Sequence, residues 1–271
     1  MIKDTRHGPV LRIQMSRYPD FRPPRVVSAY VINELIIDTG PACTVAELAD
    51  FLRQADIRLG VNTHHHEDHV GANKFFQDRR GVEIFAHPAA VDRIRERPVL
   101  SAPQEEVWGY PIPSEVKPVP DYVEVSNLHF KVIYTPGHAR GHICLFEREN
   151  GWLFSGDAYI TSRPVVCRNV ENQWQMIEDL KRMRGLQPTA MFTAPSGVFI
   201  SPASRLTSAI DYLEDLGAEI TRLYNKGMEI PQIRQTLFGD ESPFAALTLG
   251  HFSSLNMVRS FLRQCGNDDE D

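Results

Sequence analysis

The chain has 271 residues, of which 42% are hydrophobic and 24% are charged, and its formal net charge is -6. This length and composition allow one or two domains with a large core and argue against global disorder. The modest negative charge, without a long basic run, argues against a nucleic-acid-binding protein.

The N-terminal residues contain no apolar segment of the signal-peptide type, and no stretch approaches the length of a membrane span. The four cysteines are scattered and form no Cys-x-x-Cys pair: Cys43, Cys144, Cys167 and Cys265. We therefore predict a cytoplasmic protein that acts on a small-molecule substrate and binds neither membrane nor nucleic acid. Cys144 lies in an apolar run and is interpreted as a core residue.

In the first hundred residues, short apolar runs alternate with helical patterns. Strands are predicted at 10–15, 26–32, 35–37, 57–61 and 82–86. Helices are predicted at 44–55, 70–78 and 88–95. The segment 97–121 contains six prolines and is interpreted as an excursion rather than a packed element. It is either a lid or binding loop or a surface connection.

The second half continues the alternation and then becomes helical. Strands are predicted at 122–125, 128–134, 143–147, 152–154 and 190–194, and a helix at 171–183. From Pro202 onward the pattern is helical, with an amphipathic stripe and a last helix at 255–262. The alternation predicts an α/β core over 1–200, with a helical extension over 201–271 packed on it. An amphipathic helix in this extension could also form a homodimer.

One stretch dominates the chemistry of the sequence, Thr63-His64-His65-His66-Glu67-Asp68-His69. Side chains two apart on an extended segment point the same way, so His64 and His66 can bind one ion. Asp68 and His69 follow where the chain turns and can face a second ion. Imidazole and carboxylate ligands suit zinc, iron and manganese. The alternative is a solvated histidine cluster on a surface loop.

Two further polar residues follow apolar runs in the same way. His138 comes after the strand predicted at 128–134 and a Pro-Gly turn, and Asp157 comes after the strand predicted at 152–154. Loops at strand ends are where α/β folds build sites. Either residue alone is a weak signal, but with the histidine loop they predict one metal centre.

These motifs, Thr-His-x-His-x-Asp-His-x-Gly, Thr-Pro-Gly-His and Ser-Gly-Asp, together resemble the metallo-β-lactamase-fold superfamily. The segment Leu35-Ile36-Ile37-Asp38-Thr39-Gly40 is similar to that family's early strand and Asp turn, and the resemblance covers about residues 25 to 200. It implies a four-layer αβ/βα sandwich with metals at one edge between two sheets.

The resemblance also implies a set of ligands. His64, His66 and His138 would form the first metal site, Asp68 and His69 would belong to the second, and Asp157 would bridge the two ions. One or two zinc ions are expected, with iron or manganese as alternatives. His142 is interpreted as structural.

The sequence departs from the family pattern at a late turn, where the family usually has a further histidine. Ser196 stands there in this chain, which predicts a weaker second site. We consider as a hypothesis that His251 replaces the missing ligand.

The resemblance is strongest to glyoxalase II-type members, partly because Asp68 is followed by a histidine. It implies a metal-dependent hydrolase in which a metal-bound hydroxide attacks the activated carbonyl of a thioester, lactone or ester. Asp68 is the candidate catalytic residue that orients the water or takes its proton. Two alternatives remain open: a mononuclear iron enzyme of the persulfide dioxygenase type, and a catalytically degenerate member that binds a ligand.

Overall fold

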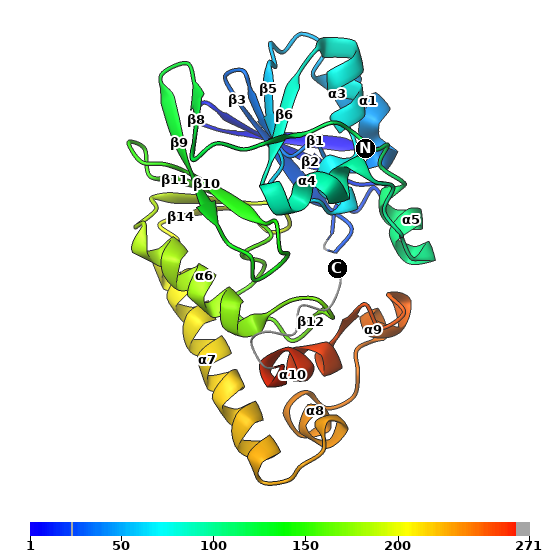
Figure 1. Cartoon of the computed structure of the whole chain (residues 1–271), viewed down its shortest axis with the longest axis vertical. Helices are drawn as coiled ribbons and strands as arrows, with labels where there is room; N and C mark the ends of the chain where they lie inside the picture. The colour runs from blue at the N-terminus through cyan, green and yellow to red at the C-terminus, as the bar shows by residue number, and fades with distance from the viewer. Residues whose placement is uncertain (23, 264–271) are drawn as a thin grey trace.

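A computed structural model describes residues 1–22 and 24–263, and it places two β-sheets face to face between two layers of helices (Figure 1). The first sheet contains, in spatial order, β1 (Ile2–His7), β2 (Val10–Met15), β3 (Val27–Ile32), β4 (Leu35–Ile37), β5 (Leu59–Val61), β6 (Glu83–Ala86) and β7 (Lys117–Pro118). The second contains β14 (Gly197–Ile200), β13 (Ala190–Thr193), β11 (Trp152–Gly156), β10 (Ile143–Glu147), β9 (Leu128–Tyr134) and β8 (Tyr122–Val125).

Helices cover both outer faces of this sandwich. Those that follow strands of the first sheet are α1 (Val45–Phe51, after the short 3-10 helix Ala42–Thr44), α2 (Glu67–Val70), α3 (Asn73–Arg80), α4 (Pro88–Arg95) and α5 (Ala102–Trp108). Those of the second half are α6 (Gln173–Gly185), α7 (Ala203–Asn225), α8 (Ile230–Phe238), α9 (Pro243–Leu247) and α10 (Ser254–Leu262).

Three apolar clusters separate the layers. Phe130, Phe154 and Phe192 lie in the cluster between the two sheets. Phe76 belongs to the cluster between the first sheet and its helices, and a third cluster joins the second sheet to α6, α7, α8 and α10. The four-layer α/β sandwich implied by the resemblance is thereby confirmed. Cys144 is fully buried, as its apolar context predicts.

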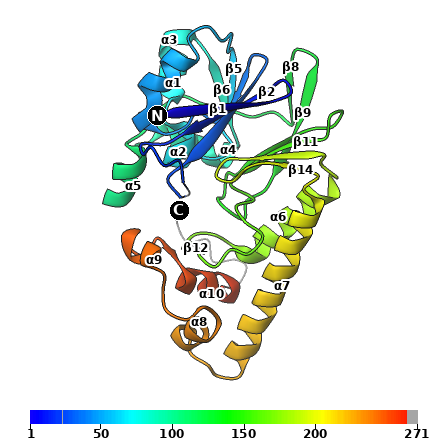
Figure 2. The same cartoon turned by 180° about the vertical axis from the view of Figure 1, so that it is seen from behind.

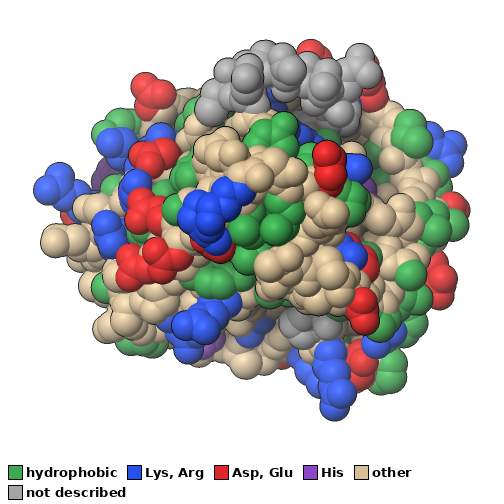
Figure 3. Space-filling view, turned by 90° about the horizontal axis from the view of Figure 1, so that it is seen from below, with side chains coloured by type: hydrophobic (Ala, Val, Ile, Leu, Met, Phe, Trp, Pro, Cys, Tyr) green, Lys and Arg blue, Asp and Glu red, His purple; other side chains and the backbone are tan. Residues whose placement is uncertain are grey.

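The C-terminal helices extend from one end of the sandwich. From behind, α7 reaches from the sandwich to α8, and α10 returns toward the core (Figure 2). A two-stranded sheet pairs β12 (Cys167–Arg168) of the core with β15 (Phe252–Ser253) of this extension. From below, hydrophobic side chains gather near the middle of this end, among charged side chains of both signs (Figure 3). The predicted domain boundary at residue 200 and the predicted homodimer both stay predictions.

The predicted elements need two corrections. The helix predicted at 70–78 is wrong in its bounds: α2 already begins at Glu67 inside the histidine loop, and α3 begins at Asn73. The segment 97–121 contains α5 and β7, so its interpretation as an unpacked excursion is wrong. Ser101 and Gln104 form a capping box at the start of α5, where a proline in the first turn is compatible with a helix. Within the described residues no helix is both long and apolar enough to span a bilayer, and Cys265 lies outside them.

Candidate metal centre

The histidine loop begins where β5 ends and turns into the short helix α2. His66 is the last extended residue before α2, with ψ at 151°, so the chain changes direction between His66 and Asp68. His64 Nε2 lies 2.7 Å from His66 Nδ1, and His138 Nε2 lies 3.1 Å from the same atom. Three imidazoles from two distant loops therefore converge on one point, and all three are buried.

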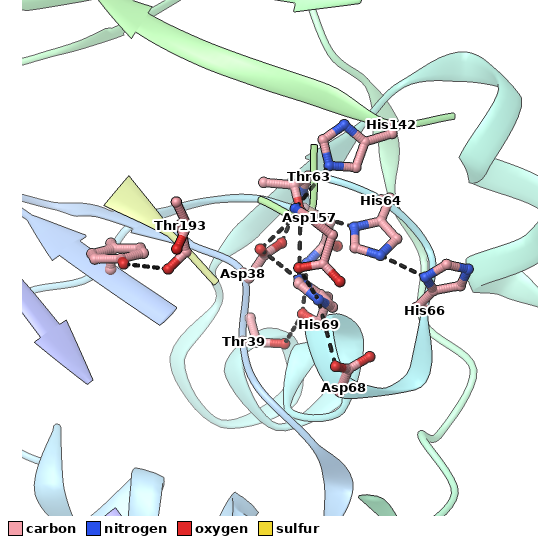
Figure 4. Close-up of polar contacts among 12 residues, drawn as sticks. Asp38, Thr39, Thr63, His64, His66, Asp68, His69, His142, Asp157 and Thr193 are labelled. Carbon is pink, nitrogen blue, oxygen red and sulfur yellow. Dashed lines mark hydrogen bonds and ion pairs between the residues drawn. The ribbon is translucent and has the colours of Figure 1, made fainter. Parts of the chain in front are cut away.

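Asp38, at the end of β4, fixes the orientation of the histidine loop from behind (Figure 4). Its Oδ1 accepts a hydrogen bond from Thr63 N at 2.7 Å, and its Oδ2 lies 2.8 Å from both Thr63 Oγ1 and His69 Nδ1. A carboxylate only accepts, so His69 Nδ1 carries a proton and Nε2 is the nitrogen on the side of Asp68 and Asp157. Thr63 gives its hydroxyl proton to Asp38, so it accepts from His64 Nδ1 at 3.0 Å and leaves His64 Nε2 free.

The turn that carries His138 is held by α6. Asp179 accepts a hydrogen bond from Gly137 N at 2.7 Å, and burial raises the pKa of this carboxyl to about 6. A Cβ at Gly137 would lie 2.6 Å from Met176 N, so the turn packs too closely for any other residue. Glu171 Oε1 lies 3.2 Å from His138 Nδ1, which favours the proton on Nδ1 and leaves Nε2 to face His66.

Asp157 lies between His69 on one side and His138 on the other. Its Oδ1 is 3.6 Å from His69 Nε2 and its Oδ2 is 3.6 Å from His138 Nε2, so each oxygen faces a different group. His142 holds the backbone of Asp157 in place. Its Nε2 accepts a hydrogen bond from Asp157 N at 3.1 Å, and its Nδ1 lies 2.8 Å from Thr135 Oγ1. Both ring nitrogens of His142 are thus engaged, as expected for a structural histidine.

His69 lies among three carboxylates. Its Nε2 is 3.6 Å from Asp68 Oδ2, in addition to its contacts with Asp38 and Asp157. Burial opposes protonation, but the three carboxylates hold the pKa of His69 well above its ordinary value. Burial, with neighbouring charges adding to its effect, lowers the pKa of His64 and His66 well below their ordinary value. Two neutral imidazoles therefore stand beside a cationic one.

These residues fit a metal ion. His64, His66 and His138 form one set with ligand atoms within 4.8 Å of one another, and His64, His69 and Asp157 form a second. His69 Nε2 and Asp157 Oδ1 are buried without a hydrogen-bond partner, as expected of atoms meant for a metal. Asp68 is in neither set but adjoins the second through His69. The nitrogen and oxygen donors suit zinc, iron or manganese.

The two residues considered for the second metal site, Ser196 and His251, are engaged in other contacts. The Ser196 hydroxyl donates to the carbonyl of Ile160. His251 Nε2 accepts a hydrogen bond from Arg168 Nε at 2.7 Å. Among the described residues, neither belongs to the two sets, so the hypothesis that His251 is a ligand gains no support from its position.

Three functional contacts had no clear signal in the sequence. Asp38 lay inside a recognised motif, but its role as the partner of His69 depends on a contact across 31 residues. Glu171 reaches His138 from the segment before α6. Glu67, although buried, accepts from Gln104 Nε2 at 2.9 Å, and this bond connects α5 to the histidine loop. Each contact joins residues far apart in the chain, so no local pattern could indicate it.

About half of this chain is similar in sequence to proteins described as hydrolases or thioesterases. The chain is 31% identical over 124 residues to a hydroxyacylglutathione hydrolase of Pelagibacter ubique, an alignment covering 45% of this chain and 44% of that enzyme. It is 30% identical over 155 residues to an acyl-coenzyme A thioesterase, MBLAC2, of Gallus gallus, which covers 46% of this chain and 53% of that protein. The matched part spans about half the length of these relatives.

Solved structures match over more of the chain. A beta-lactamase domain protein from Burkholderia ambifaria superposes with a TM-score of 0.71 over 98% of this chain and 91% of its own, at 16% identity. The protein TTHA1623, solved in a di-iron-bound form, gives 0.56 over 67% of this chain and 93% of its own, at 21% identity. The family model described as the metallo-beta-lactamase superfamily matches residues 22–194. The chain therefore belongs to the metallo-β-lactamase superfamily.

Proposed function

We propose that this protein is a metal-dependent hydrolase that cleaves thioesters, and that esters and lactones are secondary substrates. The observation that carries the proposal is the position of Asp157, whose two oxygens face His69 and His138, one from each of the two candidate ligand sets. Hydrolases described as acting on hydroxyacylglutathione and on acyl-coenzyme A are among its relatives, and both names denote an acyl group on a thiol sulfur.

When bound, the metal would supply Lewis acidity, lowering the pKa of water and polarising the substrate carbonyl. His64, His66 and His138 would hold one ion, and His69 and Asp157, with Asp68 beside them, would hold a second. The side chains of Asp68 and Asp157 keep 18% and 15% exposure, whereas His64 and His69 are fully buried. The centre therefore opens to substrate on its carboxylate side.

Asp68 is suited to accept the proton of the attacking water. Burial raises the pKa of Asp68 to about 6, while the neighbouring His69 opposes the rise. A base with a pKa near the working pH is the most effective proton acceptor. A thiolate leaves with little acid assistance because thiol pKa values are about 8.5, whereas an amine would need a proton donor. The arrangement therefore supports thioesters better than amides.

The test combines metal analysis with a substrate panel. Protein purified without added metal is assayed for zinc, iron and manganese, and for hydrolysis of a simple thioester, a lactone and a phosphoester. We expect thioester turnover that falls at least about 100-fold in His66→Ala. The control is His129→Ala, an exposed histidine beside Glu124, which should leave turnover unchanged.

Two outcomes would replace the proposal. Bound iron with oxygen consumption and no hydrolysis would indicate an oxidoreductase. Absence of metal and of turnover would indicate a ligand-binding member of the family.

A further inference from the structure

Arg168 is a buried arginine at the junction between the core and the helical extension. It lies in β12, which pairs with β15 so that Arg168 stands opposite Phe252. Only 7% of Arg168 is exposed, and its guanidinium carbon lies 5.4 Å from the centre of the Phe252 ring. Asn256 ties the two segments together by donating to the carbonyls of Cys167 and His251. The side chain is therefore held in a defined position.

The charge of Arg168 has no acidic partner within the part of the chain that the structure describes. Its one hydrogen bond there runs from Nε to His251 Nε2, at 2.7 Å. Burial, followed by the charge of Arg168, lowers the pKa of His251 to about 4, so this histidine is neutral and acts as an acceptor. Other arginines, such as Arg25 with Asp20 and Arg222 with Glu219, do have carboxylate partners. A buried charge with no carboxylate at ion-pair distance among the described residues is costly, which points to an anion that binds there.

The guanidinium edge remains open to that anion. The terminal nitrogens of Arg168 make no hydrogen bond with a described residue. They are also not fully buried, unlike the unpartnered nitrogen His69 Nε2. They therefore reach accessible space. Two parallel N–H groups of a guanidinium match the two oxygens of a carboxylate.

Arg168 also lies close to the metal centre. Glu171 N donates to the Arg168 carbonyl at 3.3 Å, and the Glu171 carboxylate contacts His138. The charge of Arg168 acts on His66, adding to the effect of burial in lowering its pKa, and on Asp68, where it opposes burial. The charge of Arg168 is thus within electrostatic range of Asp68, and a group bound by Arg168 would occupy the same region as a carbonyl held beside Asp68.

We propose that Arg168 is a specificity-determining residue, which binds a carboxylate on the acyl part of the substrate, and that His251 is the residue that positions it. The inference rests on the proposed function, since it concerns the substrate of the same centre. In a coenzyme A thioester the charged groups of the thiol are many bonds away from the sulfur, so the acyl side is the part within reach of Arg168.

The test compares two thioesters that differ only in the terminal charge of the acyl group. Glutaryl and pentanoyl thioesters of N-acetylcysteamine share a neutral leaving group, and the enzyme-free rate is subtracted. We expect the wild type to prefer the glutaryl thioester. Arg168→Gln should lower kcat/KM for it on the order of 10- to 100-fold, the size expected for a lost charge-assisted pair, and change the pentanoyl value less than about threefold.

Matched variants separate this role from a structural one. Arg163→Gln makes the same change at an exposed arginine of the same segment and should leave both rates unchanged. His251→Phe removes the acceptor and should raise KM for the glutaryl thioester with little effect on kcat, whereas His251→Gln should restore the wild-type KM. Equal losses for both thioesters in Arg168→Gln, or a wild type that prefers the pentanoyl thioester, would overturn the proposal.

A binding measurement tests Arg168 independently of catalysis. Calorimetry on the metal-loaded protein compares glutarate with pentanoate, for the wild type and Arg168→Gln. Tighter glutarate binding that is lost in the variant supports the proposal even where no thioester is hydrolysed, in which case only the proposed function fails. Equal binding of glutarate by the two proteins overturns the role of Arg168.

Discussion

Replacing Asp38 by asparagine should reduce metal binding at His69 more than it reduces the stability of the fold. The two oxygens of Asp38 accept three hydrogen bonds, from Thr63 N, Thr63 Oγ1 and His69 Nδ1. Asparagine offers one acceptor and one donor group, so its oxygen can still accept from Thr63 N. Its NH₂ group then faces the other two donors.

The least costly response is loss of the Nδ1 proton of His69. If His69 gives up this proton and keeps the one on Nε2, Nδ1 can accept from the new amide, and the buried hydrogen bond is kept. The cost to the metal-free protein is then about 1–3 kcal/mol, the value for one buried donor left unpaired, here the Thr63 hydroxyl. The proton on Nε2, however, occupies the atom that faces Asp157 and Asp68. We therefore expect a loss of about 10- to 100-fold in affinity for the ion held by His69.

Three measurements separate these effects. Urea unfolding of metal-free protein gives the change in stability, and titration with zinc gives the stoichiometry and affinity of each ion. The ¹⁵N chemical shifts of the His69 ring report which of its nitrogens are protonated without any metal. Asp56→Asn, at an exposed carboxylate paired with Arg58, is the control and should change none of them. An Asp38→Asn protein that keeps the wild-type protonation of the His69 ring and wild-type affinity for every ion would refute the reasoning.

Other changes test neighbouring parts of the centre. Asp179→Ala should destabilise the protein by about 1–3 kcal/mol in urea unfolding, because Gly137 N–H loses its acceptor. Asp179→Asn keeps an acceptor. Since the pKa of Asp179 is raised to about 6, wild-type stability includes a contribution that is lost as pH rises through 6. The asparagine variant should therefore compare more favourably with wild type at pH 8 than at pH 5, and the opposite trend would contradict this account. Ser196→His should raise the affinity for a second ion in a zinc titration, and no gain would mean that Ser196 is not at the missing ligand position. Because the metal-free protein holds a proton on His69 well above pH 6.5, affinity for the ion at His69 should rise about tenfold per pH unit between pH 6 and 7, and a pH-independent affinity would exclude that competition.

Sequence patterns predicted the elements that depend on local chemistry. The strand Leu35–Ile37 and the helix Pro88–Arg95 agree with the structure to the residue. The first is an apolar run ended by turn residues, and the second has proline at its first position. The sequence pattern did not predict that this segment divides into α2 and α3, because the division depends on packing. Gly71 lies between the two helices, and a Cβ there would lie 2.2 Å from Ala42 N.

In the candidate site, too, the residues in local motifs were predicted and the contacts that depend on the fold were not. The residues expected as ligands stand in recognisable motifs, and the structure brings His64, His66, His69, His138 and Asp157 together. Their binding of metal stays a prediction. The pair of Arg168 and His251 joins positions 83 residues apart and belongs to no motif. Only the pairing of β12 with β15 reveals it, because that pairing brings the helical extension to the metal centre.

Whether the centre holds one ion or two depends on charge as well as on the number of ligands. The first set consists of three histidines, and burial keeps His64 and His66 neutral, so their lone pairs are available at neutral pH. The second has fewer imidazoles, but it lies among three carboxylates whose charge is only partly offset by one proton on His69. A divalent ion replaces that proton and balances more of the negative charge. If Ser196 stands at the missing ligand position, the second site lacks a donor but keeps this charge, and the second ion would be held mainly by electrostatics. Its affinity should then depend on pH and ionic strength more than that of the first ion, and this difference would distinguish the two sites.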